Sequence, residues 1–249
     1  IEAAEAFADL KIVALADANM SLADGLDAPV LAAALSNRVL SGKPNVLLVV
    51  TPTGRRADAL ADALGDLIPD ADVRSFPAWE TLPHERLSPS AETVGRRIET
   101  LRALRAFDGS RPLVVTASVR AALQPIAPGL GEVHPIELIV GTRGNDLDAT
   151  VGGLVELAYS RVDMVSRRGE FAVRGGILDV FPAVAEHPYR VEFFGDEVDQ
   201  IRAFSVADQR SLPGEVAAVV LPASRELLLT DAVRSRAAAL DPSPSTRNT

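Results

Sequence analysis

The part of the sequence best suited to binding a nucleotide is residues 46–64, where an apolar run is followed by a turn and a helical pattern. Such a loop needs glycines whose backbone N–H groups converge on the phosphates, a lysine for the β and γ oxygens and a hydroxyl for Mg²⁺. The turn here, TPTGRRAD, has a single glycine, Gly54, with Arg55 in the place of the lysine and Arg56 in the place of the hydroxyl. The sequence therefore predicts that this site does not hydrolyse ATP.

No other set of residues has the spacing of a catalytic or metal site. The two lysines, Lys11 and Lys43, lie outside any phosphate-binding context. The acidic run at residues 196–199 superficially resembles a Mg²⁺-binding DExD box, but it follows Gly195 in a predicted hairpin turn, where solvated side chains are the simpler interpretation. The histidines at positions 84, 134 and 187 lack metal-site spacing, and cysteine is absent. We predict no catalytic residue, cofactor-binding residue or metal ligand.

Residues 167–201 combine alternating apolar residues with a high density of charges. Gly175 and Gly176 supply a tight turn between two strands, and a third and fourth strand follow at residues 189–194 and 198–204. In the fourth strand, alternation places Val198, Arg202 and Phe204 on one side and Ile201 and Ala203 on the other. The pattern predicts an antiparallel meander that serves as a recognition surface.

Charge is unevenly distributed along the chain. The net charge is −9, which argues against a broad nucleic-acid-binding surface. Residues 161–174, however, hold four arginines against two acidic residues and carry +2. This local basic stretch is either a solvated face or a partner-binding surface, and composition alone leaves both interpretations open.

The elements that position these residues differ between the two halves of the chain. Helical patterns at residues 29–41, 57–64 and from 91 onward, with Val94, Ile98, Leu101 and Leu104 on one face, alternate with strand patterns at 46–50, 73–76 and 113–116. Ser118 is positioned to cap the next helix. The first half is therefore α/β with a parallel sheet. The second half is α+β, and we expect the apolar strand VAAVVLPA after residue 206 to return to the first sheet.

The composition is that of a soluble globular protein, with 47% hydrophobic and 24% charged residues in 249. No apolar run approaches the roughly 20 residues of a membrane span, and no signal peptide is recognisable, so we expect a cytoplasmic protein without a membrane partner. The start at Ile1 and the polar tail SPSTRNT suggest part of a longer protein.

Two segments carry a family resemblance. The segment GEFAVRGGILDVFP, followed by YRVEFFGDEVDQIRAF, resembles the UvrB-homology module of bacterial nucleotide-excision-repair proteins. Upstream, FPAWETLPHERLSPSAETVGRRIETL resembles the transcription-repair coupling factors, the Mfd family, and not UvrB itself. The resemblance extends over residues 46–221, and the two motifs in this order make it specific.

The resemblance implies an α/β fold class, with a degenerate RecA-like parallel-sheet domain that has lost its nucleotide site and an inserted smaller α+β domain containing the antiparallel meander. We expect the RecA-like domain at residues 1–122 and 207–249 and the inserted domain at 123–206. The inserted domain would bind UvrA, the damage-recognition ATPase. The matching positions are Arg161, Arg174, Glu170, Phe171 and Arg190. Arginines and aromatic anchors commonly dominate interfaces, although alternation could equally place Phe171 in the core.

The same resemblance implies a non-catalytic module that recruits nucleotide excision repair to stalled RNA polymerase. RNA polymerase and DNA would be bound by other domains of the parent, an ATP-dependent DNA translocase, and ATP and Mg²⁺ would be needed only there. The alternative is a UvrB-like, NTP-dependent DNA-remodelling domain. UvrB clamps damaged DNA with a long aromatic-rich hairpin, whereas the loop around Trp79 is short and aromatic residues make up 4% of the chain. We therefore expect weak, non-selective DNA binding.

Overall fold

The computed structural model describes residues 22, 25–40, 45–81, 87–127, 129–144, 146–229 and 231–239. The chain divides into two compact units, the first comprising residues 1–84 and 99–126 and the second residues 85–98 and 127–249. One boundary between them falls within helix α4 (Ala91–Arg105). No helix in the described ranges is long and apolar enough to cross a membrane.

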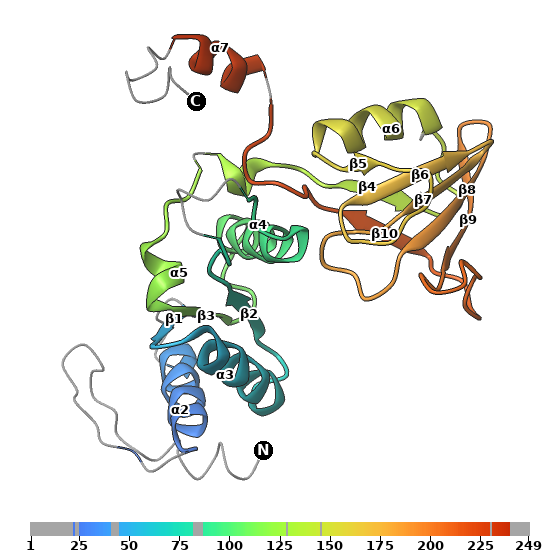
Figure 1. Cartoon of the computed structure of the whole chain (residues 1–249). Helices are drawn as coiled ribbons and strands as arrows, with labels where there is room; N and C mark the ends of the chain where they lie inside the picture. Colours follow the sequence, from blue (N-terminus) through green and yellow to red (C-terminus); the bar gives the residue numbers. More distant parts are fainter. Residues whose placement is uncertain are drawn as a thin grey trace. The chain divides into compact units, whose positions relative to one another are not determined.

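The first unit is built on a parallel three-stranded sheet with the strand order β1-β3-β2 (Figure 1). Its strands are β1 (Val46–Thr51), β2 (Asp72–Phe76) and β3 (Leu113–Ser118). Its helices are α2 (Asp27–Leu40), α3 (Gly54–Leu67), the second half of α4, and α5 (Val119–Leu123). Strand and helix alternate along the chain, which confirms the predicted α/β class.

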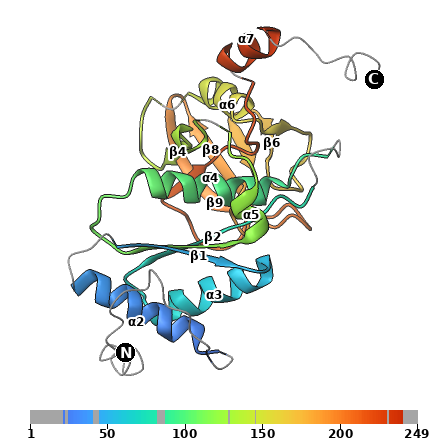
Figure 2. The same cartoon turned by 90° about the vertical axis from the view of Figure 1, so that its left-hand side faces the viewer.

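Both faces of this sheet have an apolar layer. Helices α2 and α3 cover one face, where Leu35, Leu64 and Val114 are buried together (Figure 2). On the other face, Val115 is buried in a cluster against which Leu101 of α4 packs. The predicted cap of α5 is confirmed, because the Ser118 hydroxyl oxygen accepts a hydrogen bond from the backbone N–H of Ala121 at 3.1 Å.

Strand β1 is less buried than its continuous apolar sequence indicates. Leu48 and Val50 are 61% and 47% exposed, whereas their neighbours across the ladder, Val115 and Ala117, are buried. The reason is that β1 has a strand neighbour on one side only among the described residues, and the helices pack against its other face. The apolar run therefore predicted the strand correctly, and the position of β1 in the sheet leaves two of its side chains exposed.

The second unit contains a five-stranded sheet and a separate two-stranded sheet. The five strands, in the order β5-β6-β7-β8-β9, are β5 (Ser160–Arg161), β6 (Glu170–Arg174), β7 (Ile177–Val180), β8 (Tyr189–Phe194) and β9 (Glu197–Ala203). Strands β6 to β9 form the predicted antiparallel meander. The two-stranded sheet pairs β4 (Ile136–Ile139) with β10 (Ala218–Leu221), and the helical segments are η2 (Leu130–Glu132), α6 (Leu147–Glu156) and α7 (Asp231–Ala239).

The expectation that the strand after residue 206 returns to the first sheet is wrong. That strand is β10, and it pairs antiparallel with β4, with Val219 opposite Leu138 and Leu221 opposite Ile136. Val219, Leu138 and Leu221 are buried, so this pair closes the core of the second unit. Residues 207–229 consequently group with the second unit and not with the parallel sheet, unlike the predicted boundaries.

A β-bulge changes which side chains of β9 point into the core. Glu192 of β8 pairs with Gln200 and the next residue, Phe193, pairs with Val198, so Asp199 has no opposite residue. An extra residue of this kind reverses the alternation on one side of the bulge. Val198 and Ile201 are therefore both fully buried, instead of lying on opposite sides as alternation predicts.

The first half of α4 is part of the second unit. Gly95 approaches the loop after β7 so closely that a Cβ placed on it would lie 2.7 Å from the Ala183 Cβ. Arg97 is fully buried, and its Nε lies 2.5 Å from Glu226 Oε1. These contacts explain why residues 85–98 group with residues that lie far along the sequence, which the predicted domain boundaries did not anticipate.

Candidate protein-binding site

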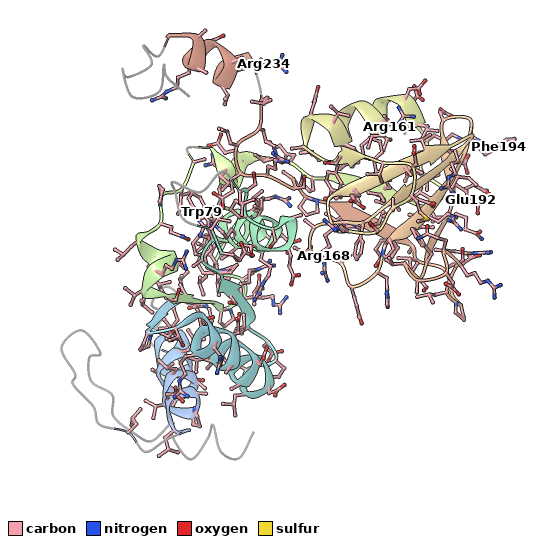
Figure 3. The ribbon with its side chains drawn as sticks, in the orientation of Figure 1. Trp79, Arg161, Arg168, Glu192, Phe194 and Arg234 are labelled. Atoms are coloured by element: carbon pink, nitrogen blue, oxygen red, sulfur yellow. The ribbon has the colours of Figure 1, made fainter. Side chains whose placement is uncertain are left out.

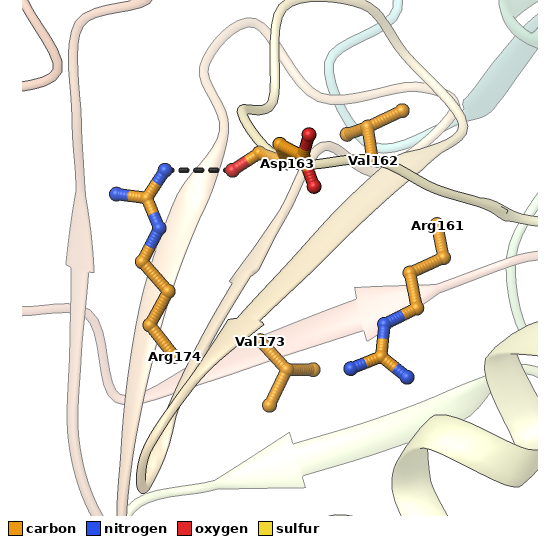
Figure 4. Close-up of a pocket in the computed structure, with 5 residues that line it drawn as sticks. All are labelled: Arg161, Val162, Asp163, Val173 and Arg174. Carbon is orange, nitrogen blue, oxygen red and sulfur yellow. Dashed lines mark hydrogen bonds between the residues drawn. The ribbon is translucent and has the colours of Figure 1, made fainter.

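A pocket lies where β5 and the loop after it run beside β6 (Figure 4). It is lined by Arg161, Val162, Asp163, Val173 and Arg174, which we call the arginine pocket. Arg174 Nη2 donates a hydrogen bond to the Asp163 carbonyl oxygen at 2.6 Å, which holds one guanidinium against the rim. Arg161 lies on β5, and both arginines are exposed. The structure thus brings together the two arginines that the sequence motif singled out.

Glu170 lies at the start of β6 and organises the loop that leads to it. Its Oε2 accepts hydrogen bonds from the backbone N–H groups of Ser166 and Arg167, both at 2.8 Å, and from the Ser166 hydroxyl at 3.2 Å. Arg168 anchors the same loop, because its Nε donates to the Ala185 carbonyl oxygen and its Nη1 lies 3.1 Å from Glu92 Oε2. Glu170 therefore has a structural role in fixing the loop of the arginine pocket.

Phe171 and Arg190 are held inside the second unit. Phe171 is fully buried, so its ring belongs to the core, one of the two interpretations that the sequence left open. Arg190 forms a bidentate pair with Asp179, with Nε 2.7 Å from Oδ1 and Nη2 2.8 Å from Oδ2, and stacks over the Phe204 ring. The hydrogen bond to Asp179 raises the pKa of Arg190 above its ordinary value. Both side chains therefore have contacts within the second unit.

One row of side chains crosses the meander beside the arginine pocket. Arg174 pairs with Ile177, Ile177 with Glu192, and Glu192 with Gln200, so these four side chains share one face of the sheet. We call them the polar sheet face. Gln200 donates a hydrogen bond to Glu215. The sequence analysis missed Gln200 and Glu192, which is labelled in Figure 3. Alternation from Arg190 in β8 is the signal that would have found Glu192.

The turn at residues 51–56, where the sequence has the pattern of a phosphate loop, makes internal contacts of the first unit. The Thr53 hydroxyl oxygen caps α3 by accepting from the Arg56 backbone N–H at 3.3 Å. Arg56 Nη2 lies 2.6 Å from Asp27 Oδ2, which neutralises the guanidinium at this end of the helix. Trp79 is half-buried, and its backbone N–H donates to Gln124 Oε1 at 2.7 Å, which anchors its loop within the first unit.

The acidic run at residues 196–199 begins in the turn between β8 and β9, as predicted. Glu197 Oε2 lies 3.0 Å from Arg143 Nε, and this hydrogen bond is the main cause that raises the pKa of Arg143 above its ordinary value. Within the described ranges no group of three or more His, Asp or Glu side chains is arranged to hold a metal ion. His84, Lys11 and Lys43 lie outside those ranges. One carboxylate of the acidic run, that of Glu197, is thus paired with an arginine.

The meander and its arginine pocket lie within a recognised class of interaction domain. Residues 136–225 match the family described as the UvrB interaction domain. The matched range starts at β4 and ends just after β10, so it agrees with the strand pairing that closes the second unit.

The relatives identify the particular family. The chain is 57% identical over 199 residues to the transcription-repair-coupling factor of Mycobacterium bovis, 34% over 212 residues to that of Bacillus subtilis and 33% over 178 residues to that of Escherichia coli. These matches cover 78%, 84% and 71% of this chain, but 16%, 17% and 15% of the relatives. The chain belongs to the transcription-repair coupling factor (Mfd) family and spans about one sixth of the length of these relatives.

Proposed function

We propose that this chain is the UvrA-binding module of a transcription-repair coupling factor and that it recruits nucleotide excision repair to stalled RNA polymerase. The observation that carries the proposal is the surface formed by the arginine pocket and the polar sheet face, on which Arg161 and Arg174 are exposed. That surface lies within the range that matches the UvrB interaction domain. A surface shared with UvrB supports UvrA as the partner, because UvrB and the coupling factor act in one repair route.

The chemistry of the surface favours a protein partner with carboxylates. Arg161 and Arg174 lie on either side of Val173, so two planar donor groups flank an apolar floor (Figure 4). The Asp163 carbonyl already orients Arg174, which lowers the entropy lost when that side chain binds a carboxylate. Glu192 adds one negative charge to the same surface. A partner with an aliphatic side chain between acidic residues, and a basic residue opposite Glu192, would be complementary.

The chain itself would be non-catalytic under this proposal. The rest of the parent protein would supply an ATP-driven DNA translocase, with ATP and Mg²⁺ bound there, and would contact RNA polymerase and DNA. Such a protein would act in the cytoplasm. The alternative, a UvrB-like NTP-dependent remodelling domain, requires a nucleotide site that Arg55 and Arg56 do not provide.

The proposal is tested by titrating purified UvrA with the chain and with the double variant Arg161→Glu/Arg174→Glu in a calorimeter. Loss of one member of a desolvated charge pair costs roughly 2 to 5 kcal/mol, which is about 30-fold to several-thousand-fold in affinity, and reversal costs more. The matched control, Arg55→Glu/Arg234→Glu, makes the same charge change at two exposed positions outside this surface and should retain binding.

Circular dichroism and thermal melting establish that both double variants are folded before binding is compared. If the unmodified chain fails to bind UvrA at micromolar concentration, the proposed function is wrong. If the chain binds and the folded double variant at Arg161 and Arg174 binds equally well, the binding surface lies elsewhere on the chain.

A further inference from the structure

Gln209 has a backbone conformation that residues with a side chain rarely adopt. It lies in the segment between β9 and β10, and its φ of 60° falls in the left-handed region that favours glycine. Within the described ranges, Ala158 is the one other residue besides glycines with a positive φ. Holding such a residue there costs free energy, which contacts of its surroundings must offset.

The Gln209 amide joins two segments of the second unit. Its Nε2 donates to the Val206 carbonyl oxygen at 3.0 Å and to the Val165 carbonyl oxygen, 44 residues earlier in the sequence, at 3.2 Å. Val165 belongs to residues 162–169, which connect β5 to β6, contribute to the arginine pocket and are called the pocket loop here. Glycine has no side chain to make these bonds, and asparagine, which tolerates a positive φ, is one methylene shorter. Both bonds therefore depend on the glutamine side chain.

The backbone that carries Gln209 is fixed from its other side. The backbone N–H groups of Ser205 and Gln209 donate to the carbonyl oxygens of Arg210 and Ser205, both at 2.9 Å, which closes a tight turn. Arg190 Nη1 donates to the Gln209 carbonyl oxygen at 3.4 Å, and Arg190 is itself held by Asp179. The amide is thus presented to the pocket loop from an anchored turn.

The pocket loop carries the group that orients one arginine of the pocket. Arg174 donates to the Asp163 carbonyl oxygen, and Asp163 lies two residues before Val165. Val165 is buried, and Val162 of the pocket and Val206 of the neighbouring turn pack against the same apolar cluster. A change at the Val165 carbonyl oxygen therefore reaches the carbonyl that holds Arg174.

We propose that Gln209 is a positioning residue for the arginine pocket, and that its amide holds the pocket loop in the conformation in which Arg174 meets UvrA. This inference rests on the proposed function. A surface whose binding-competent conformation is only partly populated loses affinity in proportion to that fraction. Strained residues persist where their surroundings over-determine them, and they are concentrated at functional sites. Loss of the amide therefore weakens binding without removing a side chain that lines the pocket.

The test compares the chain with Gln209→Ala and Gln209→Gly by UvrA titration, thermal melting and amide hydrogen exchange. Both variants lose the amide, but only glycine relieves the positive φ, so the glycine variant should melt at the higher temperature of the two. Both should bind UvrA about 10-fold more weakly, as expected if the competent loop is populated about one tenth of the time. Amides of the pocket loop should exchange faster in both.

The matched control is Ala158→Gly, which relieves a positive φ of 62° in the second unit without touching the Gln209 amide. It should leave the UvrA affinity unchanged. Affinity that follows the amide and not the melting temperature distinguishes positioning of the pocket from a general effect on stability.

The outcomes separate this inference from the proposal on which it depends. If the chain binds UvrA and both Gln209 variants bind equally well, Gln209 does not position the pocket and the proposed function stands. If Gln209→Gly regains affinity in step with its melting temperature, the residue acts only on stability and the inference is wrong. Weaker binding with unchanged exchange in the pocket loop would also overturn it. If the chain does not bind UvrA at all, both fail.

Discussion

Arg174 and Arg190 lie on the same face of the meander, yet their surroundings give them different roles. Arg174 is exposed at the end of β6, and its guanidinium donates to a backbone carbonyl oxygen. Arg190 is partly buried, and its guanidinium is matched by both oxygens of Asp179, which is 5% exposed. Arg190 thus satisfies a buried carboxylate within the unit, whereas Arg174 is held by a backbone carbonyl oxygen, so residues of one motif differ in what their side chains contact.

At the residue scale, we predict that Arg190→Ala destabilises the fold by roughly 1.5 to 3 kcal/mol, because it leaves the buried Asp179 carboxylate without its charged hydrogen-bond donor. Urea unfolding of the variant and the unmodified chain measures this. The control is Arg202→Ala, its cross-strand neighbour, whose 3.5 Å contact with Glu215 is exposed and should be worth less than about 1 kcal/mol. Equal unfolding free energies for the two variants would contradict the assignment.

At the scale of elements, sequence patterns predicted where most strands and helices lie but not how all of them pair. The meander, the parallel strands and the cap at Ser118 follow from local turn chemistry and periodicity, which act over a few residues. The bulge at Asp199 depends on pairing with β8, and the pairing of β10 with β4 joins residues about 80 apart in sequence. Neither has a local signal, so alternation placed Val198 wrongly and the domain boundary after residue 206 was misplaced.

The candidate site was predictable to a similar degree. The motif supplied Arg161 and Arg174, which the structure places in one pocket, and it also supplied Phe171, Glu170 and Arg190. Phe171 is buried in the core, Glu170 binds the backbone of a loop and Arg190 binds Asp179. Neighbours across the sheet and in the loops determine these contacts. Burial is a tertiary property, and a single sequence does not report it.

Gly95 tests whether the first half of α4 packs against the loop after β7. Glycine inside a helix is normally about 0.5 to 1 kcal/mol less stable than alanine, so replacement should stabilise an unobstructed helix. A methyl group added at Gly152 of α6 would meet no atom within 4 Å, whereas one at Gly95 would lie 2.7 Å from Ala183 Cβ and 2.8 Å from Val184 Cγ1. We predict that Gly152→Ala raises the free energy of unfolding. Gly95→Ala should lower it, by roughly 1 to 3 kcal/mol.

Chemical unfolding of both glycine variants is the measurement, with the unmodified chain as reference. The two substitutions add the same methyl group to helices that both pack in the second unit, so the sign of the difference reports whether α4 is docked against residues 183 and 184. Stabilisation by Gly95→Ala would show that the first half of α4 does not pack there.

For the whole molecule, the distribution of charge matters more than its sum. The chain carries −9 overall, but residues 161–174 carry +2 and include both arginines of the pocket. A local basic surface on an acidic protein steers an acidic partner toward one region and repels nucleic acid elsewhere. Association through this surface should therefore weaken as ionic strength rises, because the charges are exposed and screened.

The last prediction also concerns the whole chain: it does not bind Mg-ATP. The first unit keeps the strand, turn and helix of a phosphate loop, but its turn has one glycine and places Arg55 and Arg56 where a lysine and a hydroxyl belong. Arg56 is paired with Asp27, and the Thr53 hydroxyl caps α3, so the groups that remain are already bound within the unit. Calorimetric titration with Mg-ATP should give no saturable heat. Titrations at low and high salt provide the control, because non-specific attraction to arginines disappears at high salt. Saturable binding at micromolar nucleotide that persists at high salt would restore the UvrB-like alternative.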